Sequence, residues 1–193
     1  MKNTLIALSL LLASCQTQTA GNIKLLGGVR DFQDSSDWEQ TDDQTNVLGI
    51  GLDLAGKDGF GPEIGYTYSQ DVSYDDTYVN RKVNDTKSRV SEIYLGLRKN
   101  YMVNDWWQVS FSGGMSSLNV ETSVNLSYSG DTATDRGRAY APYINIGTSV
   151  FVIDNLFIGI EYRHNFLNED VDIFILDPEL DCDMYLLSIG FSF

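Results

Sequence analysis

Residues 185–193, Tyr-Leu-Leu-Ser-Ile-Gly-Phe-Ser-Phe, alternate large apolar side chains with small ones and end on an aromatic residue. Successive side chains of a strand point to opposite faces. The small face carries Ser188, Gly190 and Ser192. The apolar face carries Tyr185, Leu187, Ile189, Phe191 and Phe193. The pattern therefore predicts an amphipathic strand with one continuous apolar face.

The same alternation recurs in seven segments upstream, each with an apolar face and a face of small or polar residues. In 91–98, for example, Ile93, Leu95 and Leu97 share one face. The seven segments are 22–30, 46–54, 62–69, 91–98, 106–113, 140–148 and 156–163. Together with 185–193 they predict eight strands.

The segments between these strands are alternately short and long. Turn residues occupy the short ones, at 56–59, 100–105 and 153–155. The long, polar ones are 31–45, 70–89, 118–138 and 165–183. Short periplasmic turns and longer extracellular loops are typical of barrels that cross a membrane. We expect an all-β fold, an eight-stranded antiparallel up-and-down transmembrane β-barrel. A ten-stranded barrel is the competing topology.

The charged residues of the predicted strands indicate which face looks inward. All of them lie on the face opposite the apolar one, four positive and four negative. They are Lys24, Arg30, Asp53, Glu63, Glu92, Arg98, Glu161 and Arg163. A cation facing the middle of a bilayer costs about 2–4 kcal/mol, so this face is predicted to line the barrel. An eight-stranded barrel has room only for side chains there. We expect an ion network that packs the interior, with a narrow pore as an alternative.

The strand at 185–193 resembles the carboxy-terminal strand of bacterial outer-membrane β-barrels. In those proteins a terminal Phe and the alternate apolar positions are read by the barrel-insertion machinery. Segments 61–66 (Gly-Pro-Glu-Ile-Gly-Tyr) and 158–163 (Ile-Gly-Ile-Glu-Tyr-Arg) read like strands of the small eight-stranded barrels of the OmpA-transmembrane and OmpX/Ail type. The resemblance implies the outer membrane of a Gram-negative bacterium. By analogy, the five apolar residues of 185–193 are the expected insertion signal.

The amino-terminal residues have the features of an export signal. Lys2 precedes an apolar run at 5–12 that is too short to span a bilayer. Residues 12–15, Leu-Ala-Ser-Cys, resemble a bacterial lipoprotein box, in which the Cys is acylated. We expect residues 1–14 to be a signal peptide, Cys15 to be a lipidation site, 15–21 to be a tether and 22–193 to be the barrel.

The predicted loops carry most of the formal net charge of -14, which disfavours nucleic acid as a partner. Two of these segments also contain alternating apolar residues, at 118–128 and 171–175. These segments predict strands that rise above the membrane, whose free edge would recruit a partner chain by strand addition. The candidate contact residues are Tyr74, Tyr78, Tyr128, Ile173 and Ile175.

The sequence thus predicts a surface-exposed structural or interaction protein of the adhesion or immune-evasion kind. Its expected partners are membrane lipid and lipopolysaccharide, the export and barrel-insertion machinery, and a host or envelope protein. No catalytic, metal-binding or cofactor-binding residues are predicted.

Two alternatives remain open. A lipid-modifying enzyme would use His164, the single histidine, but Phe166 stands where the lipid A deacylase pattern has a Ser. A lipid-anchored, lipocalin-like barrel would instead turn the apolar face inward around a ligand.

Overall fold

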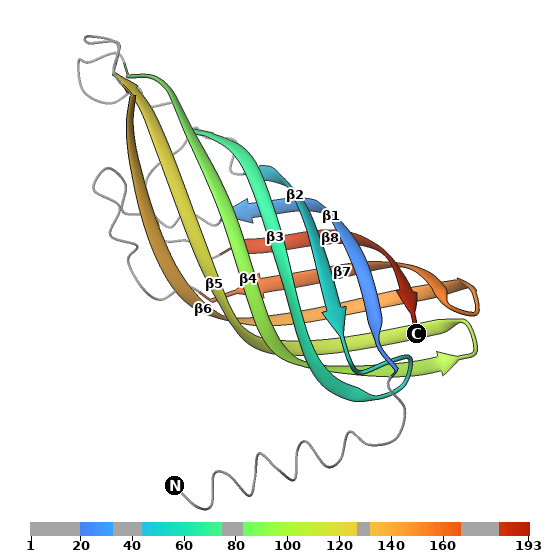
Figure 1. Cartoon of the computed structure of the whole chain (residues 1–193). Helices are drawn as coiled ribbons and strands as arrows, with labels where there is room; N and C mark the ends of the chain where they lie inside the picture. Colours follow the sequence, from blue (N-terminus) through green and yellow to red (C-terminus); the bar gives the residue numbers. More distant parts are fainter. Residues whose placement is uncertain (1–19, 33–43, 75–82, 127–131, 167–181) are drawn as a thin grey trace, which may run out of the picture.

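The computed structural model describes residues 20–32, 44–74, 83–126, 132–166 and 182–193. In these residues eight antiparallel strands close into a barrel in sequence order (Figure 1). The strands are β1 (Asn22–Phe32), β2 (Gln44–Asp53), β3 (Phe60–Tyr74), β4 (Val83–Asn104), β5 (Trp107–Leu126), β6 (Thr132–Ile153), β7 (Leu156–Asn165) and β8 (Cys182–Ser192). The predicted eight-stranded antiparallel barrel is confirmed, and the ten-stranded alternative is wrong.

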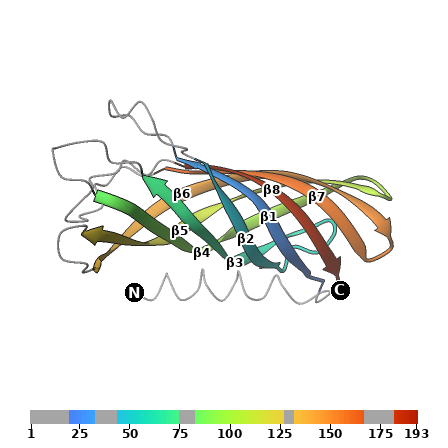
Figure 2. The same cartoon turned by 90° about the horizontal axis from the view of Figure 1, so that it is seen from above.

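The two ends of the barrel differ. One end, the turn end, carries three tight connections at 54–59, 105–106 and 154–155. The carboxy-terminal strand also finishes there (Figure 2). At this end Gly21 and Phe193 exchange two backbone hydrogen bonds of 2.9 Å, which extend the β1–β8 seam by one pair. The opposite end is called the outer end below.

Turn chemistry explains two of the tight connections. Gly56 has φ +63°, a backbone conformation that favours glycine. The Oδ1 atom of Asn104 accepts hydrogen bonds from the backbone N–H groups of Trp106 (3.0 Å) and Trp107 (2.9 Å). This Asx turn reverses the chain within two residues, so the predicted turn at 100–105 begins five residues too early.

The barrel is apolar outside and polar inside. Leu25, Leu95 and Leu187 are each about 60% exposed on the outer wall, whereas the charged residues of the strand interiors are buried. The exposed leucines can face the hydrocarbon of a membrane, whereas the buried charged residues need polar partners inside the barrel. The lipocalin-like alternative, which needs the reverse arrangement, is therefore wrong.

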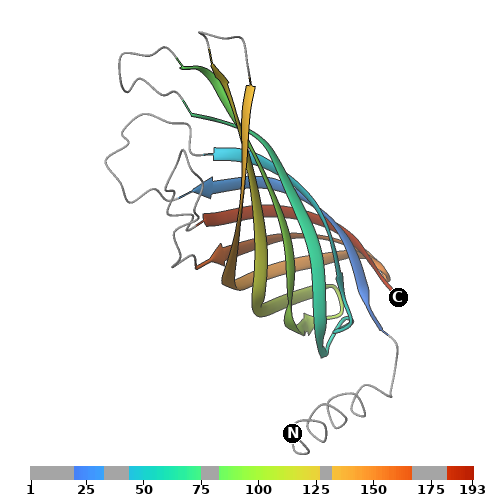
Figure 3. The ribbon, with the colours of Figure 1, turned by 60° about the vertical axis from the view of Figure 1, so that its left-hand side comes forward.

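Several strands run further than their sequence pattern predicts. At the outer end β3, β4, β5 and β6 continue past the other four strands, as Figure 3 shows. This outer extension comprises residues 70–74, 83–90, 118–126 and 132–142, most of which lie in the long predicted connections. The alternating residues of 118–128 were also predicted to form a strand above the membrane, and β5 continues to Leu126.

The phase of the alternation explains why the predicted barrel strands stop short of this extension. On β5 the outward positions are apolar as far as Met115, but Leu118 and Val120 are buried on the inward face. The apolar face thus changes sides where the strand leaves the apolar belt. A search for one constant apolar face ends at that point.

Candidate functional site

A network of ion pairs fills the barrel near the turn end. Lys24 Nζ on β1 donates to both carboxylate oxygens of Glu161 on β7, at 2.6 and 2.8 Å. Arg98 on β4 donates to Glu63 on β3 and to Glu161, both at 3.3 Å. Its Nε lies 3.7 Å from Asp53 on β2. All five side chains are at most 4% exposed. Glu161 therefore joins two cations that come from different walls of the barrel.

A second cluster lies nearer the outer end. The carboxylate of Glu92 on β4 accepts from Arg30 on β1 at 2.7 Å and from Thr67 on β3 at 2.9 Å. Asn165 on β7 donates to its other oxygen at 3.1 Å, and Arg163 Nη1 lies 3.8 Å away. The arginines and Glu92 are fully buried. The eight charged residues of the predicted interior network thus all lie inside, and each forms at least one ion pair.

Two tyrosines connect the clusters, and the sequence analysis did not single them out. The Arg163 guanidinium lies 3.5 Å from the ring centre of Tyr94 and 5.0 Å from that of Tyr143. Tyr143 Oη donates to Glu63 Oε1 at 2.8 Å. The sequence signal for them is the glycine on the inward face beside each tyrosine. A Cβ on Gly65 would lie 2.2 Å from Tyr94, and a Cβ on Gly96 would lie 2.2 Å from Tyr143.

The interior is thus a packed core in which charges of both signs neutralise each other. A buried pair of this kind contributes only if both partners are present. Within the described residues, no group of three or more His, Cys, Asp or Glu side chains is placed to hold a metal ion. The same residues contain no helix of the length and hydrophobicity that crossing a membrane requires.

The five residues of the expected insertion signal all face outward on β8 or directly after it. Their exposed fractions run from 46% for Phe191 to 64% for Leu187. At the other end of the chain, Cys15 and residues 1–19 lie outside the described residues. Cys182, at the outer end of β8, is buried and not in a disulfide.

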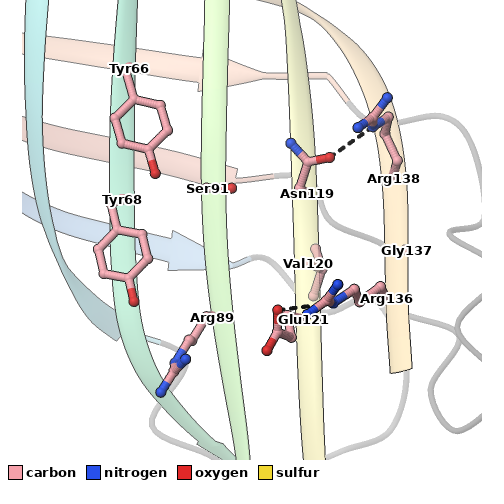
Figure 4. Close-up of a pocket in the computed structure, with 10 residues that line it drawn as sticks. All are labelled: Tyr66, Tyr68, Arg89, Ser91, Asn119, Val120, Glu121, Arg136, Gly137 and Arg138. Carbon is pink, nitrogen blue, oxygen red and sulfur yellow. Dashed lines mark hydrogen bonds and ion pairs between the residues drawn. The ribbon is translucent and has the colours of Figure 1, made fainter. Parts of the chain in front are cut away.

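The outer wall of β3–β6 carries a groove of about 440 Å³ where the apolar belt ends (Figure 4). Tyr66 and Tyr68 on β3 line one side of it. Arg136 and Arg138 on β6 line the other, and Arg89 on β4 lies between. Arg136 Nε donates to Glu121 at 3.1 Å, and Arg138 Nε to Asn119 at 2.8 Å. We call this set of side chains the outer arginine groove. The sequence analysis placed its arginines in loops and missed it.

The outer extension also has a strand edge that no described strand pairs with. β7 pairs with β6 only as far as Tyr143↔Asn165, followed by a backbone hydrogen bond from Phe166 N to Pro142 O. β6 continues to Thr132, paired with β5 alone among the described residues. Of the predicted partner-binding residues, Tyr74 ends β3, and nothing is described of its side chain. Tyr78, Tyr128, Ile173 and Ile175 lie outside the described residues.

His164 lies on the outer wall of β7 near the outer end. Its Nδ1 is 2.7 Å from Asp183 Oδ1 on β8, and Tyr162 Oη donates to the same oxygen at 2.6 Å. Its ring also contacts Phe166 edge to face, with the ring centres 4.3 Å apart. Among the described residues no Ser, Thr or Cys is hydrogen-bonded to His164. His164 and Asp183 are thus paired, and no nucleophile is hydrogen-bonded to the histidine among the Ser, Thr and Cys residues that the structure describes.

Comparison with known protein families gives one match over almost the whole sequence. The family described as outer membrane protein beta-barrel domain matches residues 4–193. No curated protein sequence matches this chain.

Solved structures share the fold at low sequence identity. OprG from Pseudomonas aeruginosa superposes with a TM-score of 0.61 at 15% identity, covering 92% of this chain and 98% of that one. Ail, the attachment invasion locus protein of Yersinia pestis, gives 0.60 at 10%, covering 92% and 100%. Neisserial surface protein A gives 0.56 at 14%, covering 91% and 96%. Another structure of Ail, with a TM-score of 0.59 at 10% identity and the same coverage, is a complex with the heparin analogue sucrose octasulfate.

Proposed function

This chain belongs to the outer membrane protein β-barrel domain family, and from that premise we propose that it is a surface interaction protein of the adhesion or immune-evasion kind. Its location is the outer membrane of a Gram-negative bacterium. In this proposal the barrel is a rigid anchor with a packed interior. The outer extension presents the binding surface to proteins outside the cell, together with the acidic segments that the sequence predicts to be loops.

One observation carries the proposal: β6 runs from Tyr143 to Thr132 without β7 beside it in the described part of the chain. At about 3.3 Å per residue this edge is roughly 35 Å long. Its backbone N–H and C=O groups that do not point toward β5 can pair with an extended segment of another chain. Such pairing needs no enclosed pocket, which suits a barrel whose interior is filled.

The similar structures agree with a surface role without defining one. Two of them carry names that describe attachment or the cell surface, Ail and Neisserial surface protein A. At 10–14% identity this likeness extends to the fold alone. The binding role of this chain is therefore proposed from its own exposed edge.

The test is a variant in which the β5–β6 part of the outer extension is shortened without changing how the two strands pair. Val120 and Gly137 are cross-strand partners, so residues 121–136 can be replaced by Asn-Gly, which closes a two-residue hairpin. Cells that display the shortened chain should lose adhesion to cultured epithelial cells and binding of serum proteins. The barrel should still insert, as shown by heat-modifiable migration on SDS gels of the outer-membrane fraction.

A second variant tests the predicted contact residues without shortening the chain. Ile173→Lys with Ile175→Lys should also reduce binding, and it should leave insertion intact. A matched control is Ile158→Lys, a substitution on the outer wall of β7, which should impair insertion instead. Unchanged adhesion in both the shortened chain and the double variant would refute the proposed function.

A further inference from the structure

The outward side chains of β3–β6 change character over three successive rows. The register pairs Ile64 with Leu95, Leu95 with Met115, and Met115 with Pro142, which makes the first row apolar throughout. In the second row Tyr66, Ile93, Ser117 and Tyr140 lie side by side. The third row is polar and consists of Tyr68, Ser91, Asn119 and Arg138. The apolar belt therefore ends within two rows on this wall.

Arginines begin where the belt ends. Arg138 stands in the third row, and Arg89 and Arg136 stand in the next, on either side of Glu121. Two residues along a strand correspond to about 6.6 Å. Arg138 is thus two rows, about 13 Å along the strand, above the last fully apolar row. Tyr66 and Tyr140 lie between them and are exposed. Tyrosine side chains favour the level at which hydrocarbon gives way to lipid headgroups.

The charge of this wall is opposite to that of the chain. The sequence has 27 Asp and Glu residues against 13 Lys and Arg. The four interior cations pair with carboxylates inside the barrel, and Arg136 pairs with Glu121. Arg138 instead donates to the amide oxygen of Asn119. Arg89 is exposed and forms no ion pair with another described residue. Two arginines of an acidic protein thus face outward without a described carboxylate partner.

We propose that the outer arginine groove binds the phosphorylated headgroup of a glycolipid in the outer leaflet, with Arg89 and Arg138 as the phosphate ligands. Guanidinium groups bind phosphate oxygens through paired, charge-assisted hydrogen bonds. Figure 4 shows the side chains of Tyr68 and Arg89 on adjacent strands, with Arg138 across the groove beside Asn119. The hydrogen bond to Asn119 engages Arg138 through Nε, and its two terminal nitrogens have no hydrogen bond to another described residue.

The position of the groove favours a lipid over a soluble anion. It lies on the outer wall, directly above side chains that contact hydrocarbon, so a lipid whose acyl chains cover Leu95 and Met115 would bring its headgroup to this level. The tyrosine rings would pack against the sugar of the headgroup. The inference rests on the outer-membrane location, and not on the binding of an extracellular protein.

The experiment uses the full chain refolded in neutral detergent micelles. Binding of bis-phosphorylated lipid A is measured by native mass spectrometry, beside dephosphorylated lipid A and inorganic phosphate. We expect the phosphorylated lipid to bind at least tenfold more tightly than the dephosphorylated one. Arg89→Gln with Arg138→Gln should weaken its binding about 25-fold, since each surface cation contributes about a fivefold gain. Added salt should weaken binding by the wild-type chain more than binding by this variant.

The matched control is Lys57→Gln with Lys99→Gln, which removes two cations at the turn end and should change binding less than twofold. Arg89→Lys with Arg138→Lys keeps both charges and should retain most of the affinity. Folding of every variant is checked by heat-modifiable migration. If a double variant does not fold, the two single variants are measured in its place. Equal binding of both lipids, or full binding by the glutamine variant, would overturn the proposal. Competition by inorganic phosphate at the concentration of the lipid would show a site for soluble anions and would equally overturn it.

Discussion

Lys24 on β1 and Glu161 on β7 are joined by two hydrogen bonds of 2.6 and 2.8 Å, although β8 separates their strands. The pair therefore links parts of the barrel wall that share no backbone hydrogen bonds. Glu161 also accepts from Arg98 at 3.3 Å and from Asn145 at 2.8 Å. One carboxylate thus holds together side chains from four strands, β1, β4, β6 and β7.

Glu161→Gln should therefore destabilise the barrel strongly. The change keeps the size of the side chain but leaves Lys24 and Arg98 facing an uncharged amide. Removing one partner of a buried ion pair costs about 3–5 kcal/mol. The free energy of unfolding in urea, with the protein reconstituted in lipid, measures this loss. Glu121→Gln is the control, because its pair with Arg136 is exposed and should contribute less than about 1 kcal/mol. Equal losses for the two variants would contradict the central position of Glu161.

The packed interior predicts that the wild-type barrel does not pass small sugars. Arg98 crosses the lumen between Glu63 and Glu161, and no other side chain of β4 makes that link in the described structure. Arg98→Ala should open a path and raise ion conductance in planar bilayers. Lys99→Ala changes the next residue of the same strand, which is partly exposed outside the barrel, and should have no effect. Rapid swelling of liposomes that contain the wild-type protein in arabinose would support the narrow-pore alternative instead.

The strand pattern within the bilayer was predictable because one physical rule governs both faces there: outward side chains must be apolar to face hydrocarbon, and charged side chains must turn inward. Ile93, Leu95 and Leu97 face hydrocarbon and are exposed, while Glu92 and Arg98 face inward and are buried. Above the belt that rule no longer applies, because water solvates the outer wall. Asn119 and Glu121 then face outward, while Leu118 and Val120 turn inward. The sequence shows the alternation at 118–120, but not that it continues β5.

Which charges pair could not be predicted either. The alternation assigns Lys24 and Glu161 to the interior, but their distance depends on strand tilt and register around the closed barrel. The positions of Tyr94 and Tyr143 beneath Arg163 depend on the same geometry. The outer arginine groove was missed because Arg136 and Arg138 lie in 118–138, which was predicted to be a connection between strands and not part of β6.

Gly65→Ala should destabilise the barrel through Tyr94. A Cβ at Gly65 would lie 2.2 Å from Cζ and Oη of that ring, which must then move away from Arg163. Such overpacking costs about 1–3 kcal/mol. Gly27→Ala is the matched control, since its nearest heavy atom would be 3.8 Å away. That variant should be as stable as the wild type, or more stable by about 0.5–1 kcal/mol. Unfolding in lipid distinguishes the two, and equal stability would refute the tight packing.

His164→Ala should leave the acylation of lipid A unchanged. The imidazole contacts Asp183, but no described hydroxyl or thiol is hydrogen-bonded to it, and nucleophilic catalysis requires such a group. Mass spectrometry of lipid A from cells that express the wild type, the variant or neither protein provides the measurement. Asp183→Asn serves as the second variant of the same contact. An acylation pattern that depends on either residue would show a lipid-modifying enzyme.

Phe193→Ala should impair assembly more than stability. The backbone of Phe193 forms two hydrogen bonds with Gly21, and these do not require its side chain. Phe193 is 54% exposed, close to the 49% of Phe111 on the outer wall of β5. The two alanine variants should therefore lose similar free energies of unfolding once refolded in lipid. In cells, only Phe193→Ala should lower the heat-modifiable fraction in the outer membrane several-fold, because the proposed insertion signal includes Phe193 and not Phe111. Equal assembly of the two variants would remove Phe193 from that signal.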